Sequence, residues 1–527
     1  MLIAFADEAR AQPAATVPAS SAIYHWLESV TAWYPSRDVP LGVRPLSRTQ
    51  VVRIVARLRR EVEADNAGNP GRRALALRQL AAIDSALDAE PDGAAITGRL
   101  SLAMEFFGSN ARLDTIKSNG LGSIDAVSHP FGDLRQGWPS ERGAIVSVAP
   151  TAALGLGHRL AIVVQPRASV FSPPASNASA ELVTQRAYVR GVVRNVALRA
   201  GADEVLWGQS SRGALFIAGN AMPLMAITVG TDAPVVLPWL FRLAGPVSIT
   251  GMVADLGRAQ DPPHTKLAGW HVAMQPWARF ELGVSVLAQQ GGRGGPEASL
   301  VDRVLDLFPL IDALDPRRGD YQFSNKLAGG NLRLRFPELS GLDLHYELLM
   351  DDFDLRRFES TVVDDFSHLV GLRLPLLVGS GQLVLHGEVH NMGLRLYEHA
   401  QFRSGVTFRD RLIGSPLGPN AKGAYLSVRW QPSPRTEWEV TLADESRDPS
   451  LYTATASGAF DEGFVFIRQT DDPRHRRRRV TSALSRNVPG GAVRMAGGYN
   501  HAWRSGEPPR GAWLGQVSFT TRGPPSF

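Results

Sequence analysis

Side chains able to bind a metal or transfer a proton recur at every second position at His386, Glu388 and His390. The residues around them alternate as in a β-strand, so these side chains share one face. Positions i and i+4 of a strand lie about 13 Å apart at the usual rise, which is too far for His386 and His390 to bind one ion. We therefore interpret the run as a ladder of side chains lining the interior of a sheet, and predict no metal site.

Other catalytic patterns are weak. The aspartate pairs at 351–352, 364–365 and 471–472 lack the spacing of an EF-hand loop, and we expect solvated loops there. The Gly-Leu-Gly sequence at 155–157 is too short for a dinucleotide-binding loop. No Gly-x-Ser-x-Gly or His-Glu-x-x-His pattern stands out. The sequence therefore predicts neither an enzyme nor a cofactor.

The run from Arg474 to Arg479 has the clearest binding chemistry. Guanidinium groups form charge-assisted bonds to carboxylates and phosphates. The run could hold an acidic polysaccharide, or it could pair with lipopolysaccharide phosphates or with its neighbours Asp471 and Asp472, and these alternatives stay open. The candidate polysaccharide-binding residues are Arg474, Arg476, Arg477, Arg478 and Arg479.

The composition narrows the class of protein. The 527-residue chain has no cysteine, which excludes disulfides, thiolate metal sites, a cysteine nucleophile and a lipoprotein anchor. Its 56 basic and 51 acidic residues give a net charge of +5, a near balance that does not indicate nucleic-acid binding. No run reaches the roughly 18–20 apolar residues of a membrane-spanning helix, although barrel strands carry a much weaker signal per segment.

The first part of the chain predicts a small helical bundle. Apolar residues recur at helical spacing in 21–33, 51–62 and 75–87, and Ser47 stands where an N-cap belongs. We assign residues 21–92 to this bundle. Residues 1–20 are expected to be a disordered N-terminus or the remnant of a signal peptide, because Ala9-Arg-Ala11 has the small-x-small pattern of a cleavage site.

From Ile96 onward the apolar period changes from about 3.6 residues to 2, the period of a strand. A soluble β-sandwich also alternates, but here the polar face is heavily charged, which is typical of the interior of a wide barrel. Tryptophans stand near expected strand ends, as in an interfacial girdle. We therefore predict a mainly β fold, a large antiparallel transmembrane β-barrel over residues 95–523 with an apolar exterior and an ionic interior. The girdle tryptophans are Trp430, Trp438, Trp503 and Trp513.

The strand count and the sidedness follow from length and parity. Roughly 430 residues accommodate about 18 strands with their connections, and 16 would also fit. If the C-terminal strand, at about 511–522, ends in the periplasm, the short turns at 488–491 and 432–434 are periplasmic too. The arginine run then lies at the extracellular end of its strand.

Several stretches resemble the Wzi family of capsule-assembly outer-membrane proteins. The clearest are 201–208, reading GADEVLWG, its continuation at 218–223, and 403–418, reading RSGVTFRDRLIGSPLG. Shorter stretches at 267–270, 275–277, 289–292 and 42–45 follow the order of that family. The resemblance covers nearly the whole chain. It implies an 18-stranded barrel, a periplasmic helical bundle, and a role in holding capsular polysaccharide at the cell surface.

These observations together predict a non-catalytic, lectin-like anchor for capsular or exopolysaccharide in the outer membrane of a Gram-negative bacterium. A transport pore for small solutes or oligosaccharides is the alternative, and a soluble β-rich periplasmic protein is a third option. The expected partners are an acidic surface polysaccharide, outer-membrane lipid and lipopolysaccharide, with no nucleic acid. A closed barrel has no free edges, so we expect a monomer.

Overall fold

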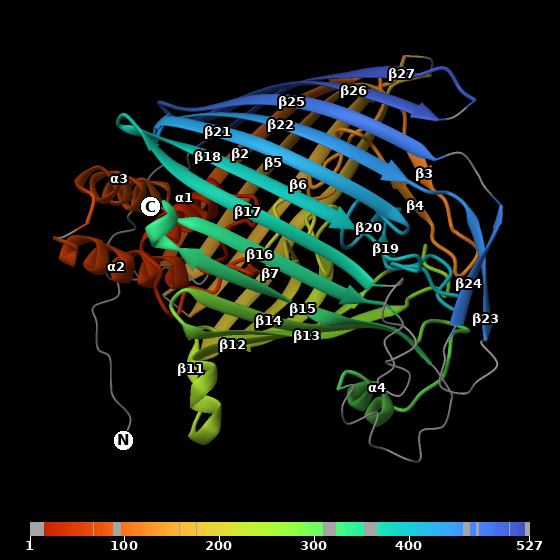
Figure 1. Cartoon of the computed structure of the whole chain (residues 1–527), viewed down its shortest axis with the longest axis horizontal. Coiled ribbons are helices and arrows are strands. Elements are labelled where there is room, and N and C mark those ends of the chain that lie inside the picture. The colour runs from red at the N-terminus through yellow and green to blue at the C-terminus, as the bar shows by residue number, and fades with distance from the viewer. Residues whose placement is uncertain are drawn as a thin grey trace.

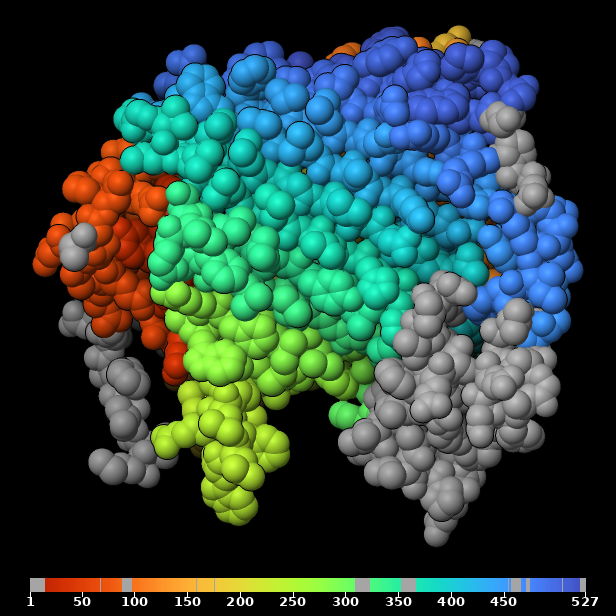
Figure 2. Space-filling model, viewed as in Figure 1, coloured from red at the N-terminus to blue at the C-terminus, as the bar shows by residue number. Residues whose placement is uncertain are grey.

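The computed structural model describes residues 15–66, 68–87, 96–157, 159–174, 176–308, 323–351, 366–456, 464–470, 474–504 and 506–521. In it, 18 antiparallel strands close into a barrel, and helices from the start of the chain pack against one end (Figure 1). The space-filling view shows these helices resting on the end of the wall (Figure 2). The predicted fold class is confirmed.

Three helices form the bundle: α1 (Ala22–Trp33), α2 (Arg48–Ala64) and α3 (Pro70–Leu87). The predicted N-cap of α2 is confirmed, since the Ser47 hydroxyl accepts the Gln50 N–H at 3.1 Å while the Gln50 side chain accepts the Ser47 N–H. The apolar faces of the helices pack into one core. None of the described helices has the length and apolar character needed to cross a membrane.

Each barrel strand pairs with the next barrel strand along the chain, and the last one pairs with the first, in the register Ala103↔Thr520. The barrel strands are β2 (Ile96–Ser109), β5 (Gly143–Leu156), β6 (Leu160–Ser172), β7 (Ser179–Val193), β8 (Val196–Asp203), β10 (Leu224–Thr231), β12 (Pro246–Asp255), β13 (Lys266–Trp277), β14 (Phe280–Gln290), β15 (Ser324–Phe336), β16 (Leu342–Met350), β17 (Phe366–Val378), β18 (Gly381–Asn391), β21 (Ala421–Ser433), β22 (Thr436–Arg447), β25 (His475–Val488), β26 (Gly491–Arg504) and β27 (Arg510–Thr521).

Short turns join strands at the end that carries the helices, which we call the bundle end. They include the turns at 488–491 and 432–436, as the parity argument predicts. Longer connections lie at the opposite loop end or turn into the lumen, and they contain β3 (Asp114–Ile116), β4 (Ala126–Ser128), β9 (Leu206–Trp207), α4 (Leu300–Asp306), β19 (Thr407–Phe408), β20 (Arg411–Leu412), β23 (Leu451–Ala456) and β24 (Phe464–Thr470). A longer connection at the bundle end carries β11 (Val235–Val236) and η1 (Trp239–Ala244) between β10 and β12 (Figure 1), and the turn from β15 to β16 carries η2 (Pro337–Leu339). β1 (Val43–Arg44) precedes α2 and pairs with β9.

The outer face of the wall is apolar. Leu100 and Phe106 of β2 are 58% and 47% exposed, and similar side chains continue around the barrel. Three of the four predicted girdle tryptophans are exposed: Trp430 pairs with Trp438 across strands near the bundle end, and Trp513 lies near the loop end. The fourth, Trp503, is partly covered. Such an exterior suits hydrocarbon rather than water.

The interior differs in part from the ionic lumen that the alternation predicts. In the half near the loop end, inward leucines from neighbouring strands are fully buried, among them Leu267, Leu287 and Leu327. They pack against apolar side chains of segments that turn inward, such as Phe216 and Tyr397. The prediction is therefore wrong for this half. The alternating pattern identifies the two faces of a strand but does not show what the inner face contacts.

Candidate functional site

The arginine run forms the start of a strand instead of a loop. Arg474 precedes β25, and Arg476 to Arg479 pair with β22 in the register Arg479↔Ala443 to Arg476↔Ser446. Successive side chains of a strand point to opposite faces. The run lies at the end of its strand opposite the 488–491 turn, as the parity argument predicts, and its five arginines divide into separate environments. The suggested partners Asp471 and Asp472 lie outside the described residues, as do the aspartates at 352 and 364–365.

Arg477 and Arg479 point into the barrel. The Arg477 side chain is 3% exposed, and it pairs with Glu445 and with Asp133, whose Oδ2 lies 3.1 Å from its Nη2. Arg479 Nη2 donates to Glu445 Oε1 at 3.1 Å, and its Nη1 donates to the Pro130 carbonyl oxygen. These guanidinium groups join the wall to the inward segment that carries Asp133.

Arg476 and Arg478 point outward. Both donate to Asp444, from Arg476 Nε at 2.8 Å and from Arg478 Nε at 3.1 Å. Both also lie over the Trp503 ring, at 5.5 and 5.4 Å from its centroid. Because they lie on the outer face near the loop end, they form a cationic cluster where the wall leaves the hydrocarbon.

Below this cluster the outer wall is hollowed. A groove of about 670 Å³ reaches from Arg478 across strands that carry the small outward residues Gly387 and Ala424 between larger apolar side chains. Its lining is apolar, so it could accommodate an acyl chain with a charged group at its loop end. The apolar lining side chains are Leu344, Val370, Leu372, Val389, Leu426, Leu442 and Val480.

Three segments that connect neighbouring strands fill the lumen. Residues 110–142 connect β2 to β5, residues 204–223 connect β8 to β10, and residues 392–420 connect β18 to β21. The second and third contact each other where Ala218 donates its N–H to the Ile413 carbonyl oxygen at 2.9 Å. Glu347 of β16 fixes the second segment by accepting backbone N–H groups at 2.5, 2.7 and 2.9 Å from Gln209, Ser210 and Leu215.

The predicted ladder at His386, Glu388 and His390 is confirmed as a buried row on the inner face of β18. The Nε2 atoms of His386 and His390 each lie 2.9 Å from a Glu388 oxygen, on either side of it. The structure adds His345 of β16, whose Nε2 lies 3.5 Å from Glu388 Oε1. Sequence spacing could not show this neighbour, because it comes from another strand.

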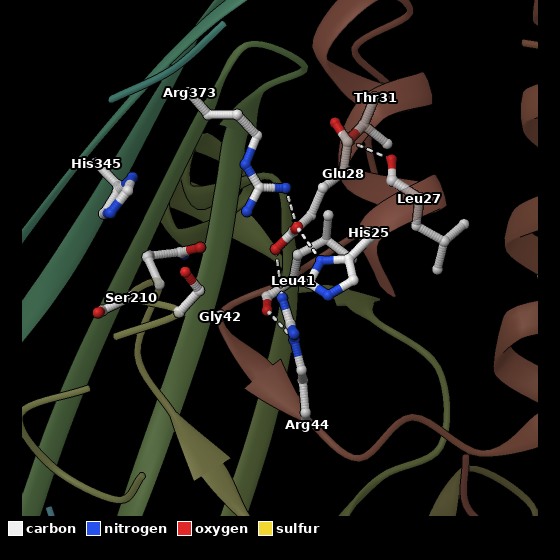
Figure 3. Close-up of polar contacts among 12 residues, drawn as sticks. His25, Leu27, Glu28, Thr31, Leu41, Gly42, Arg44, Ser210, His345 and Arg373 are labelled. Atoms are coloured by element: carbon white, nitrogen blue, oxygen red, sulfur yellow. Dashed lines mark hydrogen bonds and ion pairs between the residues drawn. The ribbon is translucent and has the colours of Figure 1, made fainter. Parts of the chain in front are cut away.

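A buried carboxylate joins the bundle to the barrel (Figure 3). Glu28 of α1 is 1% exposed and lies between Arg44 and Arg373 of β17, which both donate to it. Arg333 of β15 approaches its Oε1 to 4.0 Å. Burial raises the pKa of the Glu28 carboxyl, but the charges of Arg373 and Arg44 hold that pKa well below its ordinary value. Glu28 is therefore ionised and fixes α1 against the inner wall.

Sequence reasoning missed Glu28, and a signal was present. Its helix is apolar on nearly every side, and Glu28 is buried together with neighbours such as Leu27 and Val30. A lone carboxylate on a buried helix requires a cationic partner.

The pKa of His129, which lies on one of the inward segments, is lowered by burial inside the barrel. It is fully buried between Phe107 and Phe131, with ring centroids 5.9 and 6.1 Å away. Burial, and then the charge of Arg411, lower the pKa of the imidazole to about 3. The folded protein thus holds His129 neutral. Its contribution to stability is complete above the unfolded pKa of about 6.5 and is lost as the pH falls toward the folded value.

We expect His129→Asn to reduce the loss of stability between about pH 6.5 and about pH 4. Asparagine removes the titrating group and can still accept the Phe131 N–H, which His129 Nδ1 accepts at 3.2 Å. Thermal unfolding of both proteins in detergent across this range measures the effect. Parallel curves for variant and parent would contradict it.

Comparison with known proteins places these features in a family. A family model described as capsule assembly protein Wzi matches residues 133–465, more than half of the chain. The solved structure of Wzi from Escherichia coli, an outer-membrane protein involved in group 1 capsule assembly and described as a carbohydrate-binding β-barrel, matches with a TM-score of 0.68. Its sequence identity is 15%, over 97% of this chain and 99% of that one.

More distant matches include OprD and OccD3 of Pseudomonas aeruginosa. Both have a TM-score of 0.42, at 7% and 10% identity, and they cover 82% and 80% of this chain and 94% and 90% of theirs. No curated protein matches the chain.

A closed antiparallel barrel with an apolar outer belt and aromatic side chains at both ends is the architecture of outer-membrane proteins of Gram-negative bacteria, and this chain is such a protein. Within that class its lumen is filled by its own inward segments and its bundle end carries helices. The chain belongs to the Wzi family of capsule assembly proteins, as its motifs predict.

Proposed function

We propose that this protein is a non-catalytic, lectin-like anchor that holds an acidic capsular or exopolysaccharide at the loop end of the barrel. The filled lumen is the observation that carries this proposal, because it leaves the outer surface of the loop end for a long polymer. The carbohydrate binding described for Escherichia coli Wzi supports it. The buried lumen carboxylates Glu347 and Glu388 accept hydrogen bonds from residues 209–215, which fits a structural role and not a catalytic one.

The arginine run contributes to two different contacts in this proposal. Arg474 binds polysaccharide carboxylates, since its side chain is 64% exposed and its partner Asp448 lies 3.7 Å away. Arg403, which is 71% exposed, adds a second cation at the loop end. Arg476 and Arg478 instead contact lipopolysaccharide phosphates, with an acyl chain in the groove below them. Arg477 and Arg479 hold the wall to the inward segment.

The proposed sidedness follows from this function. The loop end faces the exterior, and residues 21–92 form a periplasmic bundle next to the barrel of residues 95–523. Residues 1–14 lie outside the described residues, so the expectation for them stays a prediction. For residues 15–20 that expectation is wrong, because Ala15, Thr16 and Val17 are buried and the Thr16 hydroxyl donates to Asp203 of β8 at 2.8 Å. The barrel closes on itself without a partner, which supports a monomer.

The test compares two double variants. Arg403→Ser/Arg474→Ser is expected to weaken binding of a soluble acidic polysaccharide about 10-fold, equal to about 1.4 kcal/mol, because two exposed charge-assisted contacts are lost. Arg476→Ser/Arg478→Ser removes the same charge from the outer wall and is the matched control, with near-parental binding. Affinity electrophoresis of the detergent-purified proteins measures both. Parental binding by the first variant, with its heat-modifiable gel migration intact, would remove these arginines from the proposal.

A further inference from the structure

Three strands bring one histidine and one glutamate together across the inner wall. The register aligns His345 of β16 with Gly371 of β17, and Gly371 with Glu388 of β18. His386 lies on the same face of β18. We call His345, His386 and Glu388 the His–His–Glu cluster, and all three are buried. Figure 3 shows His345 and Ser210 on the side of Arg373 away from α1.

Gly371 makes this approach possible. A Cβ atom at this position would lie 2.1 Å from His345 Nε2 and 3.0 Å from Glu388 Cγ. Any side chain at position 371 would therefore displace the His345 imidazole, which crosses β17 at this point. Gly371 provides the space through which His345 reaches Glu388.

The ligand atoms of the cluster have the spacing of a metal coordination shell. His345 Nε2, His386 Nε2 and a Glu388 oxygen all lie within 4.8 Å of one another. Ligands around a tetrahedral zinc ion at about 2.0–2.1 Å lie about 3.4 Å apart. The distances to Glu388 Oε1, 3.5 Å from His345 and 2.9 Å from His386, bracket that value. Among the described residues, neither Nε2 atom makes a well-aligned hydrogen bond, although both lie beside Glu388 Oε1.

The inward segment orients two of the ligands from behind. The Ser211 hydroxyl lies 3.3 Å from His386 Nδ1, the nitrogen on the far side of that ring. The Ser210 hydroxyl donates to Glu388 Oε2 at 2.6 Å, and the Ser211 N–H donates to Oε1 at 3.1 Å. Hydrogen bonds of this kind to ligating histidines and carboxylates are typical of metal sites.

We propose that the His–His–Glu cluster binds a divalent transition ion of the zinc class. Two imidazoles and a carboxylate are the donors such ions prefer, whereas magnesium and calcium favour oxygen ligands. The ion links β16 to β18 across β17, next to the inward segment that carries Ser210 and Ser211. It thereby holds this segment against the wall. This proposal is independent of the polysaccharide that the protein binds.

The test measures metal in the full-length protein. After the protein is refolded in detergent with zinc and free metal is removed, we expect inductively coupled plasma mass spectrometry to find about one zinc ion per chain. We expect the zinc content per chain to fall at least about 10-fold in His345→Gln and in His386→Gln. We expect Ser211→Ala to bind zinc about 10-fold more weakly than the parent protein does. His368→Gln is the matched control, because His368 lies on β17 beside Tyr346, its hydrogen-bond partner, at 2.7 Å.

Two further measurements keep the result independent of folding failures. Gly371→Ala keeps every ligand but blocks His345, so it should lose zinc while retaining a heat-modifiable barrel. Cobalt loaded in place of zinc should give the visible absorption of a tetrahedral site in the parent protein. A zinc content of the parent no higher than that of His386→Gln, or magnesium bound as well as zinc, would overturn the proposal.

Discussion

Replacing Glu28 with glutamine is expected to lower the free energy of unfolding by about 3–5 kcal/mol, because it leaves buried arginines without their counter-charge. Arg44 and Arg373 both donate to this carboxylate, and all three side chains are almost fully buried. Thermal unfolding and limited proteolysis of α1 in detergent measure the loss. Because the pKa of Glu28 is depressed, its stabilisation is present above the ordinary glutamate pKa and declines as the pH falls below it.

The matched control is Glu61→Gln on α2. Glu61 pairs with Arg57 at 3.3 Å, but both side chains are more than a third exposed, so the pair contributes at most about 1 kcal/mol. Glu28→Gln/Arg373→Gln should recover part of the stability, since it removes the unpaired charge as well. Equal unfolding temperatures for Glu28→Gln and Glu61→Gln would show that the buried cluster does not fix the bundle.

The sequence predicts the wall well because the wall is a local property. Alternation along each strand identifies the outer face, and Ser47 with Gln50 identifies a helix start, since both patterns lie within a few residues. The sidedness of the turns follows from strand parity alone. The exposed Trp430, Trp438 and Trp513 were found in the same way.

The contents of the lumen could not be predicted, because their contacts join distant parts of the chain. Glu28 and Arg373 are 345 positions apart, and Arg477 and Asp133 are 344 positions apart. The composition of the arginine run is typical of a solvated loop. Only the register with β22 shows which of its side chains point inward and which point outward. His345 of β16 reaches Glu388 of β18 across Gly371 of β17. Neither β16 nor β18 carries a sequence pattern that shows this contact.

The unmodified protein is expected to show no porin-type conductance in planar bilayers, because residues 110–142, 204–223 and 392–420 fill the lumen. All three segments can be removed without breaking the wall. Ser109 pairs with Gly143, Asp203 with Leu224 and Asn391 with Lys422, so a tight Asn-Gly turn can join each pair of strands directly. The variant lacking the three segments should conduct at least about 10-fold above background, since barrels of this size enclose an aqueous channel when empty.

Removal of the β23–β24 hairpin provides the matched control. This hairpin lies beyond the wall at the loop end (Figure 1), and Arg447 pairs with His475 on either side of it, so the same turn can replace it. We expect this variant to remain closed, because none of the described residues of the hairpin belongs to the buried core inside the barrel. Heat-modifiable migration of each variant shows that the barrel has formed. Conductance by the unmodified protein would favour the transport pore. A closed parent protein and an open triple deletion would instead show that the inward segments block transport, which is compatible with an anchor and not with a pore.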